Sequence, residues 1–230
     1  MTSEESESRP RPAVALDGHS GSGKSTLARR LALALHWAYL DSGAWYRALT
    51  WATLEAGAAT TSVADVLHTL SQIDITCQTD GTVLIDGRAL VDEIRTPLID
   101  TEVSNVADHQ DVRKALTLRM RDLRARPEIM GVVADGRDAG SVIFPDAVLK
   151  VFVDVSLEVR AQRRFDQQSA VHSSITLPQV HDALAERDRR DACRGEAAPR
   201  VLPDSRVLDN SSNTPEEAVG RLLEWVQAIA

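Results

Sequence analysis

The sequence predicts an α/β fold in which a central parallel sheet is covered by helices on both faces. Short apolar runs that end in polar residues alternate with segments whose apolar residues recur at helical spacing. The first run, at 13–16, leads through a glycine-rich turn into an amphipathic segment at 24–36. Ligands of such sheets bind beyond the carboxyl ends of the strands. The polar residues that follow each strand are therefore where a functional site is expected.

The remaining core elements follow from the same two patterns. Unbroken apolar runs predict further strands at 38–40, 131–134, 148–155 and 207–208. Helical spacing predicts helices at 44–55, 111–126, from 157 onward, at 178–194 and after 214. Thr214 caps the last of these, with Pro215 at its first position.

A change of character at 62–97 predicts a small antiparallel insert. Two weakly alternating apolar stretches flank Asp80 and Gly81, a pair typical of hairpin turns. The opening residues are acidic and then rich in proline and arginine, so we expect a disordered tail. The predicted boundaries are a tail at 1–12, a core at 13–61 and 98–230, and the insert at 62–97.

Composition excludes several classes of protein. The chain has 34 acidic and 26 basic residues and a net charge of -8, which argues against nucleic-acid binding because such binding leaves a basic footprint. No apolar run approaches the ~18 residues that span a bilayer, so no membrane partner is expected. Cys77 and Cys193 lie far apart and are expected to be free thiols of a reducing compartment. We expect a cytoplasmic monomer.

Residues 18–25 match the phosphate-binding pattern G-x-x-x-x-G-K-[ST] between a strand and a helix. Glycines let backbone N–H groups wrap phosphate oxygens, and the helix N-terminus adds partial positive charge. Lys24 is expected to bridge the β- and γ-phosphates of ATP, and Ser25 to ligate Mg²⁺. Asp135 is the best candidate for an acidic metal ligand. The predicted ATP site comprises Gly18, Ser20, Gly21, Ser22, Gly23, Lys24, Ser25 and Thr26.

The rest of the chain narrows the class of phosphate-binding protein. The guanine-reading motif N-K-x-D of a GTPase does not occur in the sequence, and a motor or helicase ATPase would need more than 230 residues. A small kinase of nucleotides or metabolites remains. Such an enzyme joins two anions, so it needs positive charge at the acceptor as well as at the donor.

Two arginines follow predicted strands and could supply that charge. Arg47 lies one turn into the helix after the strand at 38–40, and Arg137 lies in the sequence D-G-R-D after the strand at 131–134. Glycine beside charged residues at a strand end allows a ligand to approach closely. Taken singly, these features also fit a surface arginine and a plain turn.

Two later helices also carry arginines on single faces. One face of the predicted helix at 178–194 carries Arg187, Asp191 and Arg194. One face of the predicted helix that begins at residue 157 carries Arg160, Arg163 and Arg164. A polar segment connects the two helices. Charge runs often belong to solvated, salt-bridged helices. A lid that brings arginines over the transferring phosphate and excludes water is the alternative interpretation.

Together these motifs resemble the bacterial-type cytidylate kinase family from about residue 13 to the C-terminus. The most specific piece is G-R-D-A-G-S-V-I-F-P-D-A at 136–147, supported by 18–26, D-S-G-A-W-Y-R at 41–47, Val112-Arg113 and E-R-D-R-R-D at 186–191. The resemblance implies a three-layer α/β/α P-loop kinase with a monophosphate-binding insert and a helical lid at about 157–194. It also implies transfer of the ATP γ-phosphoryl group, with Mg²⁺, to CMP or dCMP.

The resemblance assigns roles to the residues that match its motifs. Arg47, Arg137 and Arg194 would hold the acceptor phosphate, and Arg187 and Asp191 would contact the sugar. The base would be read by Ser42, Ser104, Arg113 and Asp138. The implied catalytic set is Lys24, Arg137, Arg194, Arg160 and Arg164.

The base assignment agrees with the chemistry of cytosine. Asp138 can accept from the N4 amino group, while Arg113 and Ser104 can donate to N3 and O2. Uracil reverses the pattern at positions 3 and 4, so a hydrogen-bonding site should discriminate against UMP.

Several positions depart from the family pattern, among them His19, Ser25, Trp45 and Ala139. Trp45 either reshapes the acceptor pocket or packs in the core. Two other functions stay open at this point. One is a kinase of the same scaffold for UMP, AMP, shikimate or a coenzyme precursor. The other is a regulatory module that binds ATP without turnover.

Overall fold

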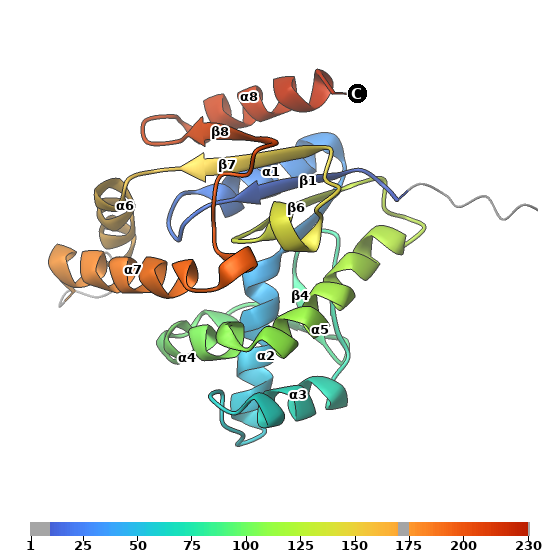
Figure 1. Cartoon of the computed structure of the whole chain (residues 1–230), viewed down its shortest axis with the longest axis vertical. Helices are drawn as coiled ribbons and strands as arrows, with labels where there is room; N and C mark the ends of the chain where they lie inside the picture. The colour runs from blue at the N-terminus through green and yellow to red at the C-terminus, as the bar shows by residue number, and fades with distance from the viewer. Residues whose placement is uncertain (1–9, 170–174, 230) are drawn as a thin grey trace, which may run out of the picture.

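The core is a five-stranded sheet whose strands all run parallel, as predicted (Figure 1). The computed structural model describes residues 10–169 and 175–229. The strand order is β2-β6-β1-β7-β8. The strands are β1 (Ala13–Asp17), β2 (Ala38–Asp41), β6 (Val132–Gly136), β7 (Leu149–Asp154) and β8 (Ser205–Asp209). The register pairs the last residues of β1, β2 and β6, so their carboxyl ends meet at one edge.

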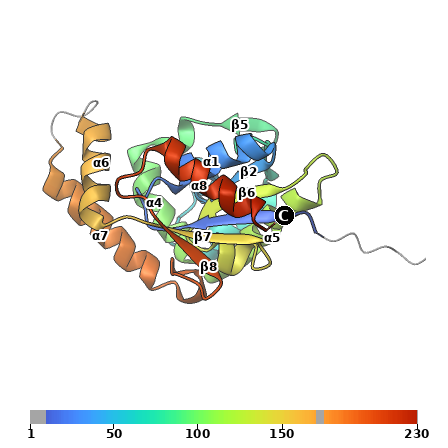
Figure 2. The same ribbon diagram turned by 90° about the horizontal axis from the view of Figure 1, so that it is seen from above.

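Helices cover both faces of this sheet, each over its own buried apolar cluster. α1 (Lys24–Leu35) and α8 (Pro215–Gln227) pack on one face, where Val14 and Leu16 of β1 point (Figure 2). α2 (Ser42–Glu55) and α5 (Gln110–Arg121) cover the other face, toward which Ala13 and Ala15 point. Successive side chains of β1 therefore point into the apolar clusters on opposite faces of the sheet. The predicted three-layer α/β/α fold is confirmed.

Some boundaries differ from the prediction. The helix expected at 111–126 is α5 followed by a separate 3₁₀ turn, Asp122–Ala125. No helix was predicted at α4 (Pro97–Asp108), although Thr96 caps it by accepting from the Ile99 N–H. Proline at the first helical position carries the same signal.

The insert contains the expected antiparallel sheet, formed by β3 (Ile75–Cys77), β4 (Val83–Ile85) and β5 (Arg88–Leu90). Its third strand was not predicted. A second turn precedes that strand, at Asp86 and Gly87, which both adopt positive φ angles of 51° and 78°. The insert also includes α3 (Val63–Gln72) and a 3₁₀ turn, Glu93–Arg95.

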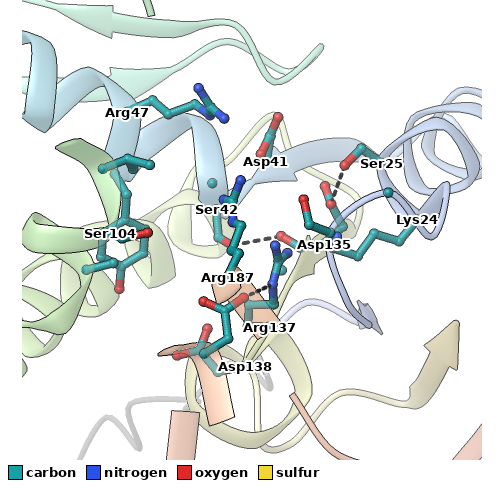
Figure 3. Close-up of a pocket in the computed structure, with 18 of the residues that line it drawn as sticks. Lys24, Ser25, Asp41, Ser42, Arg47, Ser104, Asp135, Arg137, Asp138 and Arg187 are labelled. Carbon is teal, nitrogen blue, oxygen red and sulfur yellow. Dashed lines mark hydrogen bonds and ion pairs between the residues drawn. The ribbon is translucent and has the colours of Figure 1, made fainter. Parts of the chain in front are cut away.

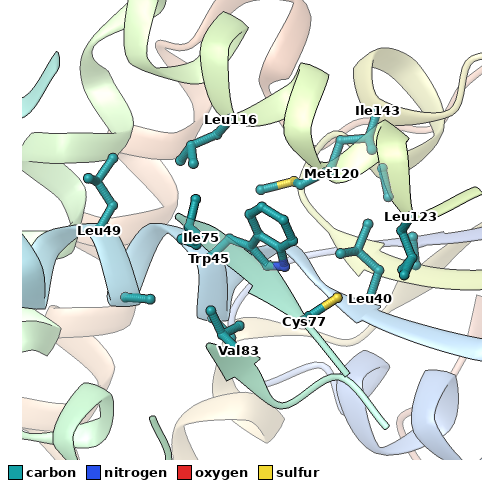
Figure 4. Packing of buried hydrophobic residues seen from close by; sticks show 14 of the residues in the cluster. Leu40, Trp45, Leu49, Ile75, Cys77, Val83, Leu116, Met120, Leu123 and Ile143 are labelled. Carbon is teal, nitrogen blue, oxygen red and sulfur yellow. The ribbon is translucent and has the colours of Figure 1, made fainter. Parts of the chain in front are cut away.

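Trp45 packs in the core, where it fills the space between the main domain and the insert (Figure 4). Its side chain is buried among Ile75 and Cys77 of β3 and Leu116 and Met120 of α5. It is not part of the wall of the cavity described below. Of the two possibilities raised by the sequence, the structure therefore supports packing.

Two helices project beyond the carboxyl ends of the strands, where a lid was expected (Figure 1). They are α6 (Leu157–Ser169) and α7 (Leu177–Ala192), which share a small apolar cluster. Part of their polar connection, 170–174, and most of the predicted tail, 1–9, lie outside the described residues. Within the described chain, Cys77 and Cys193 are free thiols, and no helix is long and apolar enough to cross a membrane.

Candidate active site

A cavity of about 680 Å³ opens at the carboxyl ends of β1, β2 and β6 (Figure 3). Its walls come from the glycine-rich loop, the starts of α1 and α2, α4, α5, the segment after β6, and both lid helices. Segments far apart in sequence thus meet where the strand order of a doubly wound sheet favours ligand binding.

The glycine-rich loop forms one side of this cavity. Gly21 and Gly23 have φ angles of 82° and 87°, a conformation that disfavours other residues and lets the loop turn sharply into α1. The first N–H groups of α1 have no acceptor within the helix and are available to an anion. Lys24 Nζ donates to the carbonyl of His19 at 3.1 Å, so the side chain folds back along the loop.

Burial lowers the pKa of Lys24, and the nearby charge of Arg137 lowers it further. The first effect is the loss of water around the ammonium group and the second is repulsion between like charges, and the carboxylates of Asp135 and Asp41 offset them only in part. An incoming polyphosphate would restore the cationic form. The electrostatics of Lys24 therefore fit a site for the donor phosphates.

Asp135 links the loop to the centre of the sheet. Its carboxylate accepts from the Ser25 hydroxyl and from the Tyr39 hydroxyl, both at 2.6 Å. Burial raises the pKa of Asp135, and the neighbouring charge of Asp41 adds to the effect. These oxygens beside the phosphate loop are the donor type that Mg²⁺ prefers. The two residues named from the sequence as candidate Mg²⁺ ligands, Ser25 and Asp135, are thus hydrogen-bonded to each other.

Arginines from four elements converge on another part of the cavity wall. Arg47 comes from α2, Arg137 from the segment after β6, Arg164 from α6 and Arg187 from α7. Arg187 lies at the centre of this group: burial lowers its pKa to about 10, and repulsion from Arg137, Arg47 and Arg164 contributes. Its Nε is buried without a hydrogen-bond partner among the described residues. An anion placed here would relieve both the repulsion and the unmet donor.

The carboxylate of Asp191 holds two arginines of the cavity wall. It accepts from Arg137 Nε at 2.7 Å and from Arg194 Nη1 at 2.5 Å, with a side chain only 2% exposed. Burial alone would raise its pKa, but Arg137 and Arg194 hold the pKa below its usual value. The buried pair fixes the direction in which both guanidinium groups point.

A second group of polar side chains occupies the opposite end of the cavity. Asp138, Arg113, Ser104 and Tyr46 all line it, and the Nε of Arg113 is buried without a partner among the described residues. Burial raises the pKa of Asp138 to about 6, with a further contribution from the charge of Asp17. One acceptor and several donors thus face a common space, as recognition of a polar base requires.

Asp17 organises the turn that presents Asp138. Its carboxylate accepts from the N–H groups of Ala139 and Gly140 at 2.7 and 2.9 Å. A single π-helical turn, Ala139–Ile143, follows. Such turns are frequent at functional sites. The family-specific sequence at 136–147 therefore serves to place a carboxylate and an arginine at the strand end.

Most of the predicted site residues line this cavity. Those on its wall are Ser20, Gly21, Gly23, Lys24, Ser25, Thr26, Ser42, Arg47, Ser104, Arg113, Arg137, Asp138, Arg164, Arg187, Asp191 and Arg194. Gly18 and Ser22 belong to the glycine-rich loop but do not line the cavity. Ser42 donates its hydroxyl to the Asp135 carbonyl at 2.8 Å, which ties the start of α2 to β6.

Arg160 does not lie where we expected it. Its side chain is 4% exposed and lies behind the phosphate loop, not on the cavity wall. It donates to the carbonyls of Val155 and Ser20 and to the carboxylate of Asp188. In this structure Arg160 therefore supports the loop from behind and does not line the cavity.

Sequence reasoning missed several residues of the cavity wall. Arg95 of the insert lines it and donates to Asp41 at 3.3 Å. Tyr46 and Arg163 line it as well, and Arg163 donates to the carbonyl of Asn210 at 2.8 Å. Arg163 had been placed on the lid face but given no role. No periodic pattern marks Arg95, because it lies in a short 3₁₀ turn.

Comparison with known proteins agrees with this arrangement. The model of the family described as cytidylate kinase matches residues 14–228. A cytidylate kinase of Burkholderia ambifaria is 39% identical over 220 residues, covering 96% of this chain and 95% of that protein. One from Cupriavidus pinatubonensis is 40% identical over 216 residues, covering 94% and 96%. The chain belongs to the cytidylate kinase family.

Proposed function

We propose that the protein transfers the γ-phosphoryl group of ATP to CMP or dCMP, giving ADP and CDP or dCDP. The observation that carries this conclusion is the joining, in one cavity, of a glycine-rich phosphate loop and a cluster of arginines from four elements. A protein that only binds ATP needs no second anion site. Family membership and the polar base-sized end of the cavity narrow the acceptor to a cytosine nucleotide.

The donor phosphates would lie along the loop, with Lys24 at the β- and γ-phosphates. Transfer requires an acceptor phosphate oxygen to attack the γ-phosphorus as the bond to the ADP oxygen breaks. Charge on the transferring oxygens would be met by Lys24, Arg137 and Arg164, which all line the cavity. Positioning of this kind accounts for most of the catalysis in phosphoryl transfer.

Mg²⁺ fits the donor side of the cavity. Ser25 and Asp135 present hydroxyl and carboxylate oxygens beside the loop, and they are joined by a 2.6 Å hydrogen bond. No set of three His, Cys, Asp or Glu residues gathers as a metal cage in the described ranges, and Mg²⁺ commonly relies on one carboxylate, water and substrate phosphates. When bound, the ion would neutralise charge on the donor phosphates.

The acceptor would be held by its phosphate and read by its base. Arg47, Arg137 and Arg194 are the proposed phosphate ligands. Asp138 would accept from the cytosine N4 amino group, with Arg113 and Ser104 donating to the ring. Arg187 and Asp191 lie between the two ends and would meet the sugar. We expect the enzyme to act as a cytoplasmic monomer, with the lid helices limiting access of water.

The test is ADP formation measured across CMP, dCMP, UMP, AMP and GMP. CMP and dCMP should give the highest kcat/KM, and equal values for CMP and UMP would contradict the base-reading scheme. Asp138→Ala should reduce the CMP-to-UMP ratio about tenfold or more, because it removes a hydrogen bond to a charged group. ATP binding should stay unchanged, since Asp138 lies away from the phosphate loop.

A further inference from the structure

The arginines proposed to hold the acceptor phosphate already have carboxylate partners. Arg47 Nη2 pairs with Asp100 at 2.5 Å, and Arg194 pairs with Asp108 at 2.9 Å. Arg164 approaches the second oxygen of Asp100 at 3.5 Å. These contacts lie at the cavity where the acceptor would bind.

Asp100 and Asp108 belong to α4 and lie on either side of Ser104, at intervals of four residues. Residues four apart share one face of a helix. Ser104 lines the cavity, and the two carboxylates extend from the same face to arginines of α2, α6 and α7. One helix face therefore carries a proposed base-reading group between two anions.

The two α4 carboxylates differ from Asp191 in burial. Asp191 is 2% exposed, whereas Asp100 is 34% and Asp108 is 40% exposed. Exposed ion pairs are weak and exchange readily, while a buried pair is costly to break. Asp191 thus orients its arginines permanently, and the contacts of Asp100 and Asp108 can be given up to a stronger anion.

We propose that Asp100 and Asp108 are resident counter-anions of the acceptor site, displaced from Arg47 and Arg194 when the acceptor phosphate binds. The proposal rests on the function given above. A phosphate group offers the same oxygen geometry to a guanidinium fork as a carboxylate does, and more charge. Asp100 holds the Arg47 guanidinium at the cavity while the cavity is empty. Asp108 accepts from Arg190 and from the side of Arg194 that Asp191 leaves open. Both aspartates therefore compete with the substrate. They are positioning residues.

The proposal predicts that removing an anion from the site strengthens substrate binding. Asp100→Asn and Asp108→Asn should each tighten CMP binding about threefold to fivefold, the range of a weak exposed ion pair, and the double variant about tenfold. KM for CMP should fall while kcat changes little. Asp111→Asn is the matched control, since Asp111 is exposed, lies nearby and pairs only with Lys114 among the described residues.

Cytidine, which lacks the phosphate, separates competition from a structural effect. Its dissociation constant, measured calorimetrically, should be the same for the wild type and both variants. Weaker or unchanged CMP binding by the double variant would overturn the proposal, and so would an equal gain for cytidine.

Binding of inorganic phosphate tests the displacement of the aspartates independently of the proposed function. If wild-type protein binds no CMP, the function fails, yet the double variant should still bind inorganic phosphate more tightly than the Asp111→Asn control does. Equal phosphate affinity in the two would overturn the exchange even if CMP is the true acceptor.

Discussion

The two ends of the cavity are built in opposite ways. The proposed donor end is one continuous segment, residues 18–26, whose backbone is expected to bind the phosphates and whose shape is fixed by the strand before it and the helix after it. The acceptor end is assembled from side chains of α2, α4, α5, α6, α7 and the segment after β6. A local motif can be recognised in a sequence by itself, while an assembled site depends on the whole fold. The two ends should accordingly respond differently to substitution.

The largest effect is expected at the donor end. Lys24→Ala should lower kcat by about 10³-fold, because it removes the cation that offsets charge on the transferring group. The variant should keep its CMP affinity, which depends on the other end of the cavity. Lys114→Ala, on the outer surface of α5, serves as the control. Loss of CMP binding in Lys24→Ala would show that the two ends are less independent than their construction suggests.

A smaller effect is expected at the acceptor end. Arg47→Met should raise KM for CMP on the order of 100-fold, since it removes one of the three guanidinium groups proposed to bind the acceptor phosphate. KM for ATP should change little. Arg30→Met, on the outer face of α1 and paired with Glu216, provides a matched loss of charge. A comparable rise in KM for ATP would contradict the division of roles.

The smallest effect is a pH dependence confined to the base-reading end. Because the pKa of Asp138 is raised to about 6, the carboxylate is charged above pH 6 and takes up a proton below it. The protonated form is a poorer acceptor for the cytosine amino group. The ratio of kcat/KM for CMP to that for UMP should fall about threefold to tenfold from pH 7.5 to pH 5.

CMP and UMP carry the same phosphate group, so the effect of its titration cancels in the ratio of their kcat/KM values. In Asp138→Asn the ratio should be low and independent of pH. A wild-type ratio that stays constant between pH 5 and pH 7.5 would count against Asp138 as the group that reads the base.

The contrast between the two ends of the cavity also shows which features could be predicted from the sequence. The phosphate loop, the single strands of the sheet and the lid helices were predictable because each depends on residues close together in the chain. The convergence of Arg47, Arg137 and Arg194 on one cavity was anticipated only through the family motifs, since no spacing rule relates residues so far apart. Whether they bind the acceptor phosphate stays a prediction.

Arg160 shows the limit of such reasoning. Its helix face and position in the lid favoured contact with the transferring phosphate, yet its side chain turns back beneath the loop. What decides this is the carbonyl of Ser20 and the carboxylate of Asp188, brought there from 140 residues before and 28 residues after it. The second hairpin turn at Asp86 and Gly87, by contrast, carried a local signal that could have been used.

The buried contacts of Arg160 have a mechanical consequence. Its guanidinium joins the end of β7, the phosphate loop and α7 at a single point near the base of α6. Moving the start of α6 away from the phosphate loop would break these buried contacts, so we expect the loop and the start of α6 to move as one unit.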